Sequence, residues 1–163
     1  MPYFGTYIDK VPDGDVIAVL ESGISTTRKL LGSVSEERAG YRYAEGKWTL
    51  KEVLGHMSDT ERIFTYRLLT FARGDAGPQP GFDETSYTPA QESDRVPLAW
   101  LLDEFVAVRA ATLALLKVLP PESWERKGVA SEHPLSVRAS AWIIAGHEIH
   151  HRRVLEERYL TAP

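Results

Sequence analysis

Four stretches of the sequence carry apolar residues at helical spacing, and this pattern limits the fold more than any other feature. They cover about residues 13–31, 48–73, 97–119 and 136–159. In the second stretch, Leu50, Met57, Phe64 and Phe71 recur every seven residues, which is the repeat of a helix packed along a bundle seam. No stretch shows the alternation of apolar and polar residues that predicts a strand. The sequence therefore predicts an all-α fold, namely a four-helix bundle.

Local signals mark the ends of the predicted helices. Thr49 and Glu52 have the spacing of a capping box at the start of the second helix, and Gly74 is a suitable stop after it. Pro97 suits the first turn of the third helix. Ser136 is the candidate N-cap of the fourth. These signals agree with the boundaries given by the apolar spacing.

The connection between the second and third helices constrains how they run. Residues 73–96 form a segment of 24 residues rich in Pro, Gly, Asp and Ser, which is too long for a simple turn. A helix of similar length is about 36 Å long, and an extended chain of this length spans more than that. The two helices can therefore run parallel, with the segment crossing back along the bundle. Because it carries Phe82 and Tyr87, the segment can also form one wall of a pocket.

Composition restricts the class of protein and its partners. A chain of 163 residues predicts one domain over 1–163. The net charge is −4 without a basic stripe, so we expect no nucleic-acid partner. The sequence has no cysteine, which excludes disulfides, thiolate metal sites and a cysteine nucleophile. Neither a signal peptide nor a membrane-spanning stretch is visible, so we expect a cytoplasmic protein without membrane contact.

Three of the five histidines lie in the run GHEIHH at residues 146–151. On a helix, His147 and His151 leave the same face with Cβ atoms roughly 6 Å apart, so both imidazoles can bind one divalent metal. His56, on the second helix, can supply a third nitrogen. Three neutral imidazoles leave a coordination position open, as reactive metal sites do. His56, His147 and His151 are the predicted metal ligands.

Other interpretations of these histidines remain open at this point. His150 is an alternative ligand three residues after His147, although a position outside the ligand set is favoured. The string His147 to His151 also matches the HExxH motif of zinc metalloproteases, but neither a downstream third ligand nor a sheet edge is predicted. Histidines on an apolar face are often ordinary core residues. Two buried imidazoles this close still need polar partners, however, and a shared metal satisfies both. His133 is expected in an exposed loop.

Several acidic residues flank the predicted ligands. Glu148 is the candidate catalytic residue, as a general base, or else an ion-pair partner of Arg152. Asp59 and Glu61 can orient a ligand imidazole, but the favoured prediction places them on a solvated helix face with Arg62.

These motifs together resemble a known family. The segments that carry the resemblance are WTLKEVLGH at 48–56, DTER at 59–62 and GHEIHH at 146–151, with FARGD at 71–75, PGFD at 80–83 and Glu104-Phe105 with Arg109. They resemble the DinB superfamily, in particular its YfiT-like branch. The resemblance extends from the first helix to Tyr159.

The resemblance implies a four-helix bundle in up-down-down-up order, consistent with the long second connection. It also implies a divalent metal, zinc or nickel, held by His56, His147 and His151, and a homodimer. Characterised relatives include S-transferases that use a low-molecular-weight thiol such as bacillithiol or mycothiol, and a thiol-dependent isomerase. Others are described only as metal-dependent hydrolases.

We therefore expect a metal-dependent transferase that acts on a small-molecule substrate with a low-molecular-weight thiol. The metal would lower the pKa of that thiol. One alternative is a metal-dependent hydrolase that uses metal-bound water, with Glu148 assisting proton transfer. Another is a non-enzymatic module that binds a metal or ligand.

Overall fold

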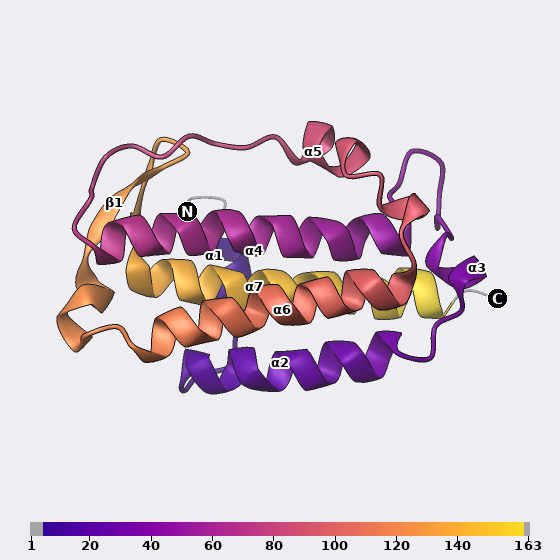
Figure 1. Ribbon diagram of the computed structural model, residues 1–163, viewed down its shortest axis with the longest axis horizontal. Helices are drawn as coiled ribbons and strands as arrows, with labels where there is room; N and C mark the ends of the chain where they lie inside the picture. The colour runs from indigo at the N-terminus through magenta and orange to yellow at the C-terminus, as the bar shows by residue number, and fades with distance from the viewer. Residues whose placement is uncertain (1–4, 162–163) are drawn as a thin grey trace.

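Four long helices lie side by side in the computed structural model, which describes residues 5–161 (Figure 1). They are α2 (Val16–Leu31), α4 (Leu50–Ala72), α6 (Leu98–Lys117) and α7 (Val137–Val154). The chain continues from α7 into a π-helical turn, Leu155–Leu160. The predicted bundle of four helices is confirmed, and its helices lie close to the predicted ranges.

Short elements that the sequence did not predict decorate this bundle. They are the helices α1 (Gly5–Ile8), α3 (Glu36–Ala39) and α5 (Glu84–Ala90), and 3₁₀ turns at Ser93–Arg95 and Pro121–Glu125. Each is too short for its apolar spacing to stand out in the sequence. The short helix α1 packs against α7, and α5 lies in the long connection.

Side-chain caps fix where the long helices begin. The Thr49 hydroxyl accepts a hydrogen bond from the Glu52 amide at 3.1 Å, and the Glu52 carboxylate accepts one from the Thr49 amide at 2.8 Å. This is the predicted capping box. Ser136 caps α7, as predicted, and Asp15 caps α2 two residues later than the predicted start. Gly74 follows the end of α4 with φ at +88°, a conformation that glycine adopts without strain.

The expectation that the chain contains no strand is wrong. Strand β1 (Lys127–Ala130) pairs with β2 (His133–Ser136) in an antiparallel hairpin between α6 and α7. The turn residues Ser131 and Glu132 have φ values of 50° and 66°, the left-handed pair of a tight hairpin turn that usually contains Asn or Gly. Four-residue strands with this unusual turn give little alternation to detect. His133 is exposed as expected, but it begins β2 and does not lie in a loop.

The connection between α4 and α6 runs along the length of the molecule. In Figure 1, α4 and α6 both begin at the right-hand end, and the connecting segment with α5 passes back above them. Gln79 attaches this segment to the hairpin, because its amide donates to the Val129 carbonyl at 2.8 Å and its carbonyl accepts from the Ser131 amide at 3.1 Å. The segment and the hairpin therefore form a cover over one side of α4.

Two apolar clusters form the core, and a polar layer lies between them. The predicted seam of α4 is buried throughout, with Leu50 and Met57 in one cluster and Phe64 and Phe71 in the other. Between them α4 buries Ser58, Thr60 and Glu61, and α6 and α7 bury further polar residues: Arg109, Thr112, His147 and Glu148. Buried polar groups require partners, so this layer is where function is to be sought.

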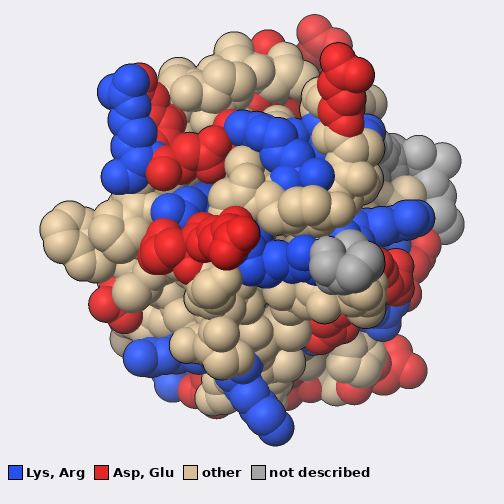
Figure 2. Space-filling view, turned by 90° about the vertical axis from the view of Figure 1, so that its right-hand side faces the viewer, with Lys and Arg blue, Asp and Glu red and all other residues tan. Residues whose placement is uncertain are grey.

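Charged side chains of both signs are intermixed on the end of the molecule seen in Figure 2. This agrees with the absence of a basic stripe in the sequence. Within residues 5–161, none of the helices combines the length and the apolar character needed to cross a membrane.

Candidate metal centre

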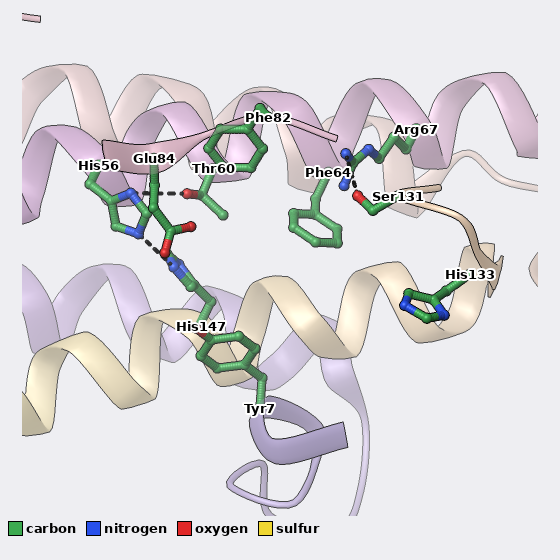
Figure 3. Close-up of a pocket in the computed structure, with 10 residues that line it drawn as sticks. All are labelled: Tyr7, His56, Thr60, Phe64, Arg67, Phe82, Glu84, Ser131, His133 and His147. Atoms are coloured by element: carbon green, nitrogen blue, oxygen red, sulfur yellow. Dashed lines mark hydrogen bonds between the residues drawn. The ribbon is translucent and has the colours of Figure 1, made fainter. Parts of the chain in front are cut away.

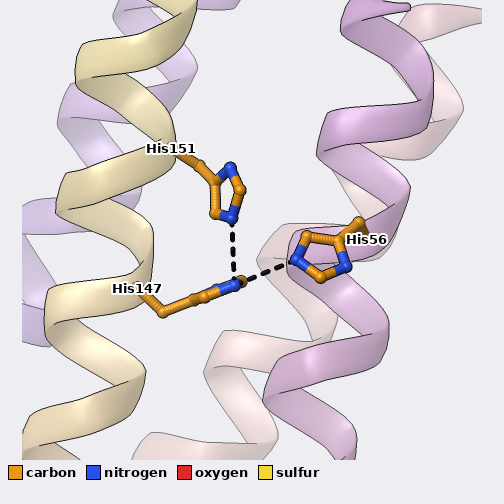
Figure 4. Close-up of side chains that lie close together, drawn as sticks. All are labelled: His56, His147 and His151. Atoms are coloured by element: carbon orange, nitrogen blue, oxygen red, sulfur yellow. Dashed lines mark hydrogen bonds between the residues drawn. The ribbon is translucent and has the colours of Figure 1, made fainter. Parts of the chain in front are cut away.

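The three histidines predicted as ligands converge from two helices (Figure 4). His56 points from α4 towards α7, where His147 and His151 lie one turn apart. The Nε2 atom of His147 is 3.0 Å from Nε2 of His56 and 3.0 Å from Nε2 of His151. One ligand nitrogen from each ring lies within 4.8 Å of the others. The structure thus brings all three predicted residues together.

Aromatic rings pack against the converging imidazoles. The Trp48 ring lies 4.9 Å from the His56 ring, and the Tyr7 ring lies 5.2 Å from the His147 ring, between centroids. His56 and His147 are only 6% and 5% exposed. These contacts limit rotation of the rings and keep their nitrogen atoms directed at one point.

Burial also sets the charge of these rings. It lowers the pKa of His56 to about 4, with a smaller contribution from His150. Burial, followed by the neighbouring imidazoles, lowers the pKa of His147 and His151 well below the usual value. Buried histidines in this arrangement are neutral at neutral pH. A neutral imidazole carries a lone pair on one ring nitrogen, the form that binds metals.

The arrangement fits a divalent metal better than it fits hydrogen bonding alone. Nε2 of His147 carries at most one hydrogen or one lone pair, so it cannot form good hydrogen bonds to both neighbours at once. Nitrogen atoms that share one tetrahedral zinc ion lie about 3.3 Å apart, close to the 3.0 Å contacts seen here. His56, His147 and His151 are therefore the residues that could hold a metal.

A cavity of about 250 Å³ opens beside the histidines (Figure 3). It lies between α1, α4, α7, the long connection and the hairpin, and its lining residues are Tyr7, His56, Thr60, Phe64, Arg67, Phe82, Glu84, Ser131, His133 and His147. The long connection forms a wall through Phe82, as its sequence suggested. Tyr87 packs against Phe82, with 5.5 Å between ring centroids.

A second cavity, of about 330 Å³, lies on the other side of the histidines. His150, His151, Trp48 and Tyr159 are among its lining residues. His150 is not one of the three converging residues, which agrees with the favoured prediction that it lies outside the ligand set. The histidine cluster is thus bordered by open space on two sides.

A model of the DinB superfamily matches residues 20–155 of the sequence. The chain belongs to the DinB superfamily. Among solved structures, YfiT from Bacillus subtilis superposes on this protein with a TM-score of 0.80, at 16% sequence identity and over 90% of each chain. That protein is described as a probable metal-dependent hydrolase with an unusual four-helix bundle topology. The likeness establishes the shared fold. No curated protein matches the sequence at a significant level.

Glu148, the predicted catalytic residue, is held in a buried hydrogen-bond network. Its Oε1 accepts a hydrogen bond from the Thr27 hydroxyl at 2.7 Å, and its Oε2 accepts one from Arg109 Nη1 at 2.6 Å. The alternative partner, Arg152, lies 3.8 Å away. The catalytic role of Glu148 stays a prediction; in the structure one of its oxygens pairs with Arg109 and the other bonds to Thr27.

Glu61 does not lie on a solvated face, so that expectation is wrong. It is 3% exposed and accepts two hydrogen bonds from Arg109, at 2.8 and 2.9 Å. Burial lowers the pKa of the Arg109 guanidinium, but Glu61 and Glu148 outweigh this effect and the net pKa is raised. The sequence did hold a signal for this buried ion pair, namely an arginine among the apolar residues of the third predicted helix. A buried guanidinium requires carboxylate partners. Asp59, in contrast, pairs with Arg62 at 3.3 Å near the surface, as expected.

Proposed function

We propose that this protein is a metal-dependent transferase that joins a low-molecular-weight thiol to a small electrophilic molecule. The observation that carries the proposal is the convergence of His56, His147 and His151 beside a cavity of about 250 Å³. The sequence has no cysteine to act as a nucleophile of its own. A thiol brought by a cosubstrate would fill that role.

The three histidines would hold the metal, and zinc or nickel is proposed because imidazole ligands suit both. When bound, the metal supplies positive charge that lowers the pKa of a nearby thiol. Tyr7 and Trp48 keep the imidazoles in position, and Phe64 and Phe82 give the cavity apolar walls.

The reaction forms one carbon–sulfur bond and breaks one bond in the electrophile. The sulfur of the ionised thiol provides the electron pair for the new bond. The leaving group departs with the electron pair of the broken bond, and the thiol proton passes to solvent or to the leaving group. No oxidant or reductant is required.

The environment of Glu148 favours thiol transfer over hydrolysis. A hydrolase benefits from a general base beside the attacking water, but both oxygens of Glu148 are occupied by Thr27 and Arg109. A thiol that is already ionised needs no such base. This difference favours the transferase over a hydrolase that would use Glu148 as its base.

Metal-dependent hydrolysis is the second candidate, and one residue favours it. Glu84 lines the same cavity as His56 and His147, and its carboxylate can act as a general base there. The description of the structurally similar YfiT as a probable metal-dependent hydrolase also supports this candidate.

Paired assays of the metal-loaded protein separate these candidates. Thiol consumption is followed with an aryl halide electrophile, and ester or amide turnover is followed without thiol. Thiol-dependent product formation that is lost in His56→Ala supports the transferase. Ester turnover without thiol, abolished by Glu84→Gln, would support the hydrolase instead. Metal binding without turnover of either kind would favour a binding module.

Three further statements complete the proposal; the helix order and the dimer rest on the family resemblance, and the cytoplasmic location rests on composition. We propose the up-down-down-up helix order, which the run of the helices in Figure 1 supports. We also propose a cytoplasmic homodimer. Light scattering tests the dimer, because a mass near 18.3 kDa, that of a single chain, would contradict it.

A further inference from the structure

Arg67 lies in the cavity beside the histidines without a carboxylate partner. Its side chain is only 2% exposed. Its Nη2 donates to the Pro80 carbonyl at 2.6 Å and to the Ser131 hydroxyl at 3.2 Å. No ion pair to Arg67 occurs among residues 5–161. The other buried arginine, Arg109, contrasts with it, because two glutamates face its guanidinium.

The remaining donors of Arg67 are not fully enclosed by the protein. A guanidinium has five N–H groups, and the bonds above use only those of Nη2. Within the described residues, Thr88 Oγ1 is the single fully enclosed polar side-chain atom that lacks a partner. The Nε and Nη1 atoms of Arg67 therefore keep some exposure, and Arg67 lines the cavity.

A buried charge without a counter-charge is unfavourable. Taking a guanidinium out of water costs several kcal/mol unless an opposite charge compensates it. Burial lowers the pKa of Arg67, and no neighbouring carboxylate offsets that effect. The site is therefore incomplete in the protein alone, and an anion in the cavity would complete it.

The predicted metal ligands His56 and His147 lie at one end of the cavity, and Arg67 lies towards the other. His56 and Arg67 are eleven residues apart on α4, close to three full turns, so they share one face about 16 Å apart along the axis. Figure 3 shows His56 and His147 at one end and the Arg67 guanidinium towards the other, where His133 also lies, with the rings of Phe64 and Phe82 between them. Glu84 lies at the histidine end in this view.

We propose that the cavity binds an elongated small molecule whose carboxylate pairs with Arg67 while its reacting end lies at the histidines. The assignment of the reacting end rests on the proposed function, whereas the carboxylate subsite rests on Arg67 alone. An apolar middle of the ligand would contact Phe64 and Phe82. Either the thiol cosubstrate or the electrophile can carry the carboxylate.

A matched pair of probes tests this proposal on cobalt-loaded protein. Binding of 8-mercaptooctanoate and 8-mercaptooctanol is measured by calorimetry, and the visible absorption of cobalt reports contact of sulfur with the metal. The carboxylate form should bind about 10- to 100-fold more tightly, as expected for a charge-assisted hydrogen bond. Equal binding of the two probes to the wild-type protein would overturn the proposal, and this comparison needs no variant.

Substitutions show which residue causes the preference for the carboxylate probe. Arg67→Gln should remove most of it while cobalt content and thermal unfolding show that the protein is folded and loaded. Arg95→Gln is the matched control, because Arg95 pairs with Glu92 at the surface and its side chain is 77% exposed. The Arg95→Gln protein should prefer the carboxylate probe as strongly as the wild-type protein does. A preference that survives in folded Arg67→Gln would show that the carboxylate binds elsewhere.

Octanoate and octyl phosphate, which lack the thiol, separate the two proposals. If octanoate binds in an Arg67-dependent manner but no thiol changes the cobalt spectrum, thiol transfer is wrong and the carboxylate subsite stands. If both thiols change the cobalt spectrum but bind equally tightly with or without a carboxylate, contact of sulfur with the metal stands and the carboxylate subsite is wrong. Tighter binding of octyl phosphate than of octanoate would overturn the assignment of a carboxylate.

Discussion

Replacing Arg109 by methionine should destabilise the protein strongly. The Arg109 side chain is fully buried, with Nε and Nη2 donating to the two oxygens of Glu61 and Nη1 donating to Glu148 and to the Leu20 carbonyl. Methionine fills much of the same space but leaves two buried carboxylates facing each other. Removing one partner from a buried ion pair costs about 3–5 kcal/mol. Since a domain has only about 5–15 kcal/mol of stability in total, this loss is a large fraction.

The free energy of unfolding is measured by urea denaturation followed by circular dichroism, with a chelator present so that metal binding does not contribute. A triple variant, Arg109→Met with Glu61→Gln and Glu148→Gln, isolates the charge effect. Neutral amides are less costly to bury than carboxylates, so this variant should recover at least about 1 kcal/mol relative to the single variant.

The surface ion pair of Arg138 provides the control. Arg138 contacts Glu125 at 2.7 Å, but its side chain is 55% exposed, so Arg138→Met should change stability by less than about 0.5 kcal/mol. A loss below about 1 kcal/mol for Arg109→Met, or a triple variant less stable than the single one, would refute the reasoning.

Three further substitutions should each lower the urea midpoint without changing the slope of the transition. Gly146→Ala would place a Cβ 2.0 Å from the Tyr7 carbonyl oxygen, so α1 must move away from α7, at about 1–3 kcal/mol; an unchanged midpoint would show that α1 is not packed as described. Tyr159→Phe removes the 2.7 Å hydrogen bond from the Tyr159 hydroxyl to the Trp48 carbonyl, worth about 1 kcal/mol, and a neutral result would argue that water replaces it. Thr49→Ala removes the α4 cap, again about 1 kcal/mol, whereas Thr49→Ser should keep most of the stability.

The long helices and the histidine cluster could be predicted because their signals are local. The capping box at Thr49 and the seven-residue repeat of α4 depend only on nearby residues. His147 and His151 share a face because they are four residues apart on one helix. Predicting His56 as a ligand required one further assumption, namely that α4 and α7 pack face to face, as they do in the bundle.

The buried network and the cavity depend on contacts between distant segments. Glu61, Arg109 and Glu148 come from three helices, and no local spacing pairs them. The burial of Arg67 arises because the long connection and the hairpin cover α4 through Pro80 and Ser131. Their path was not readable from the sequence, since the hairpin has four-residue strands and an unusual turn.

The most direct test of the metal centre is the metal content of the purified protein, measured by elemental analysis. The wild-type chain should hold about one divalent metal ion, as a three-histidine site does. His147→Ala/His151→Ala should hold none, whereas His150→Ala, which changes a neighbouring histidine outside the cluster, should keep it. A folded wild-type protein that binds no metal after incubation with zinc or nickel would contradict the site, as would a double variant with full metal content.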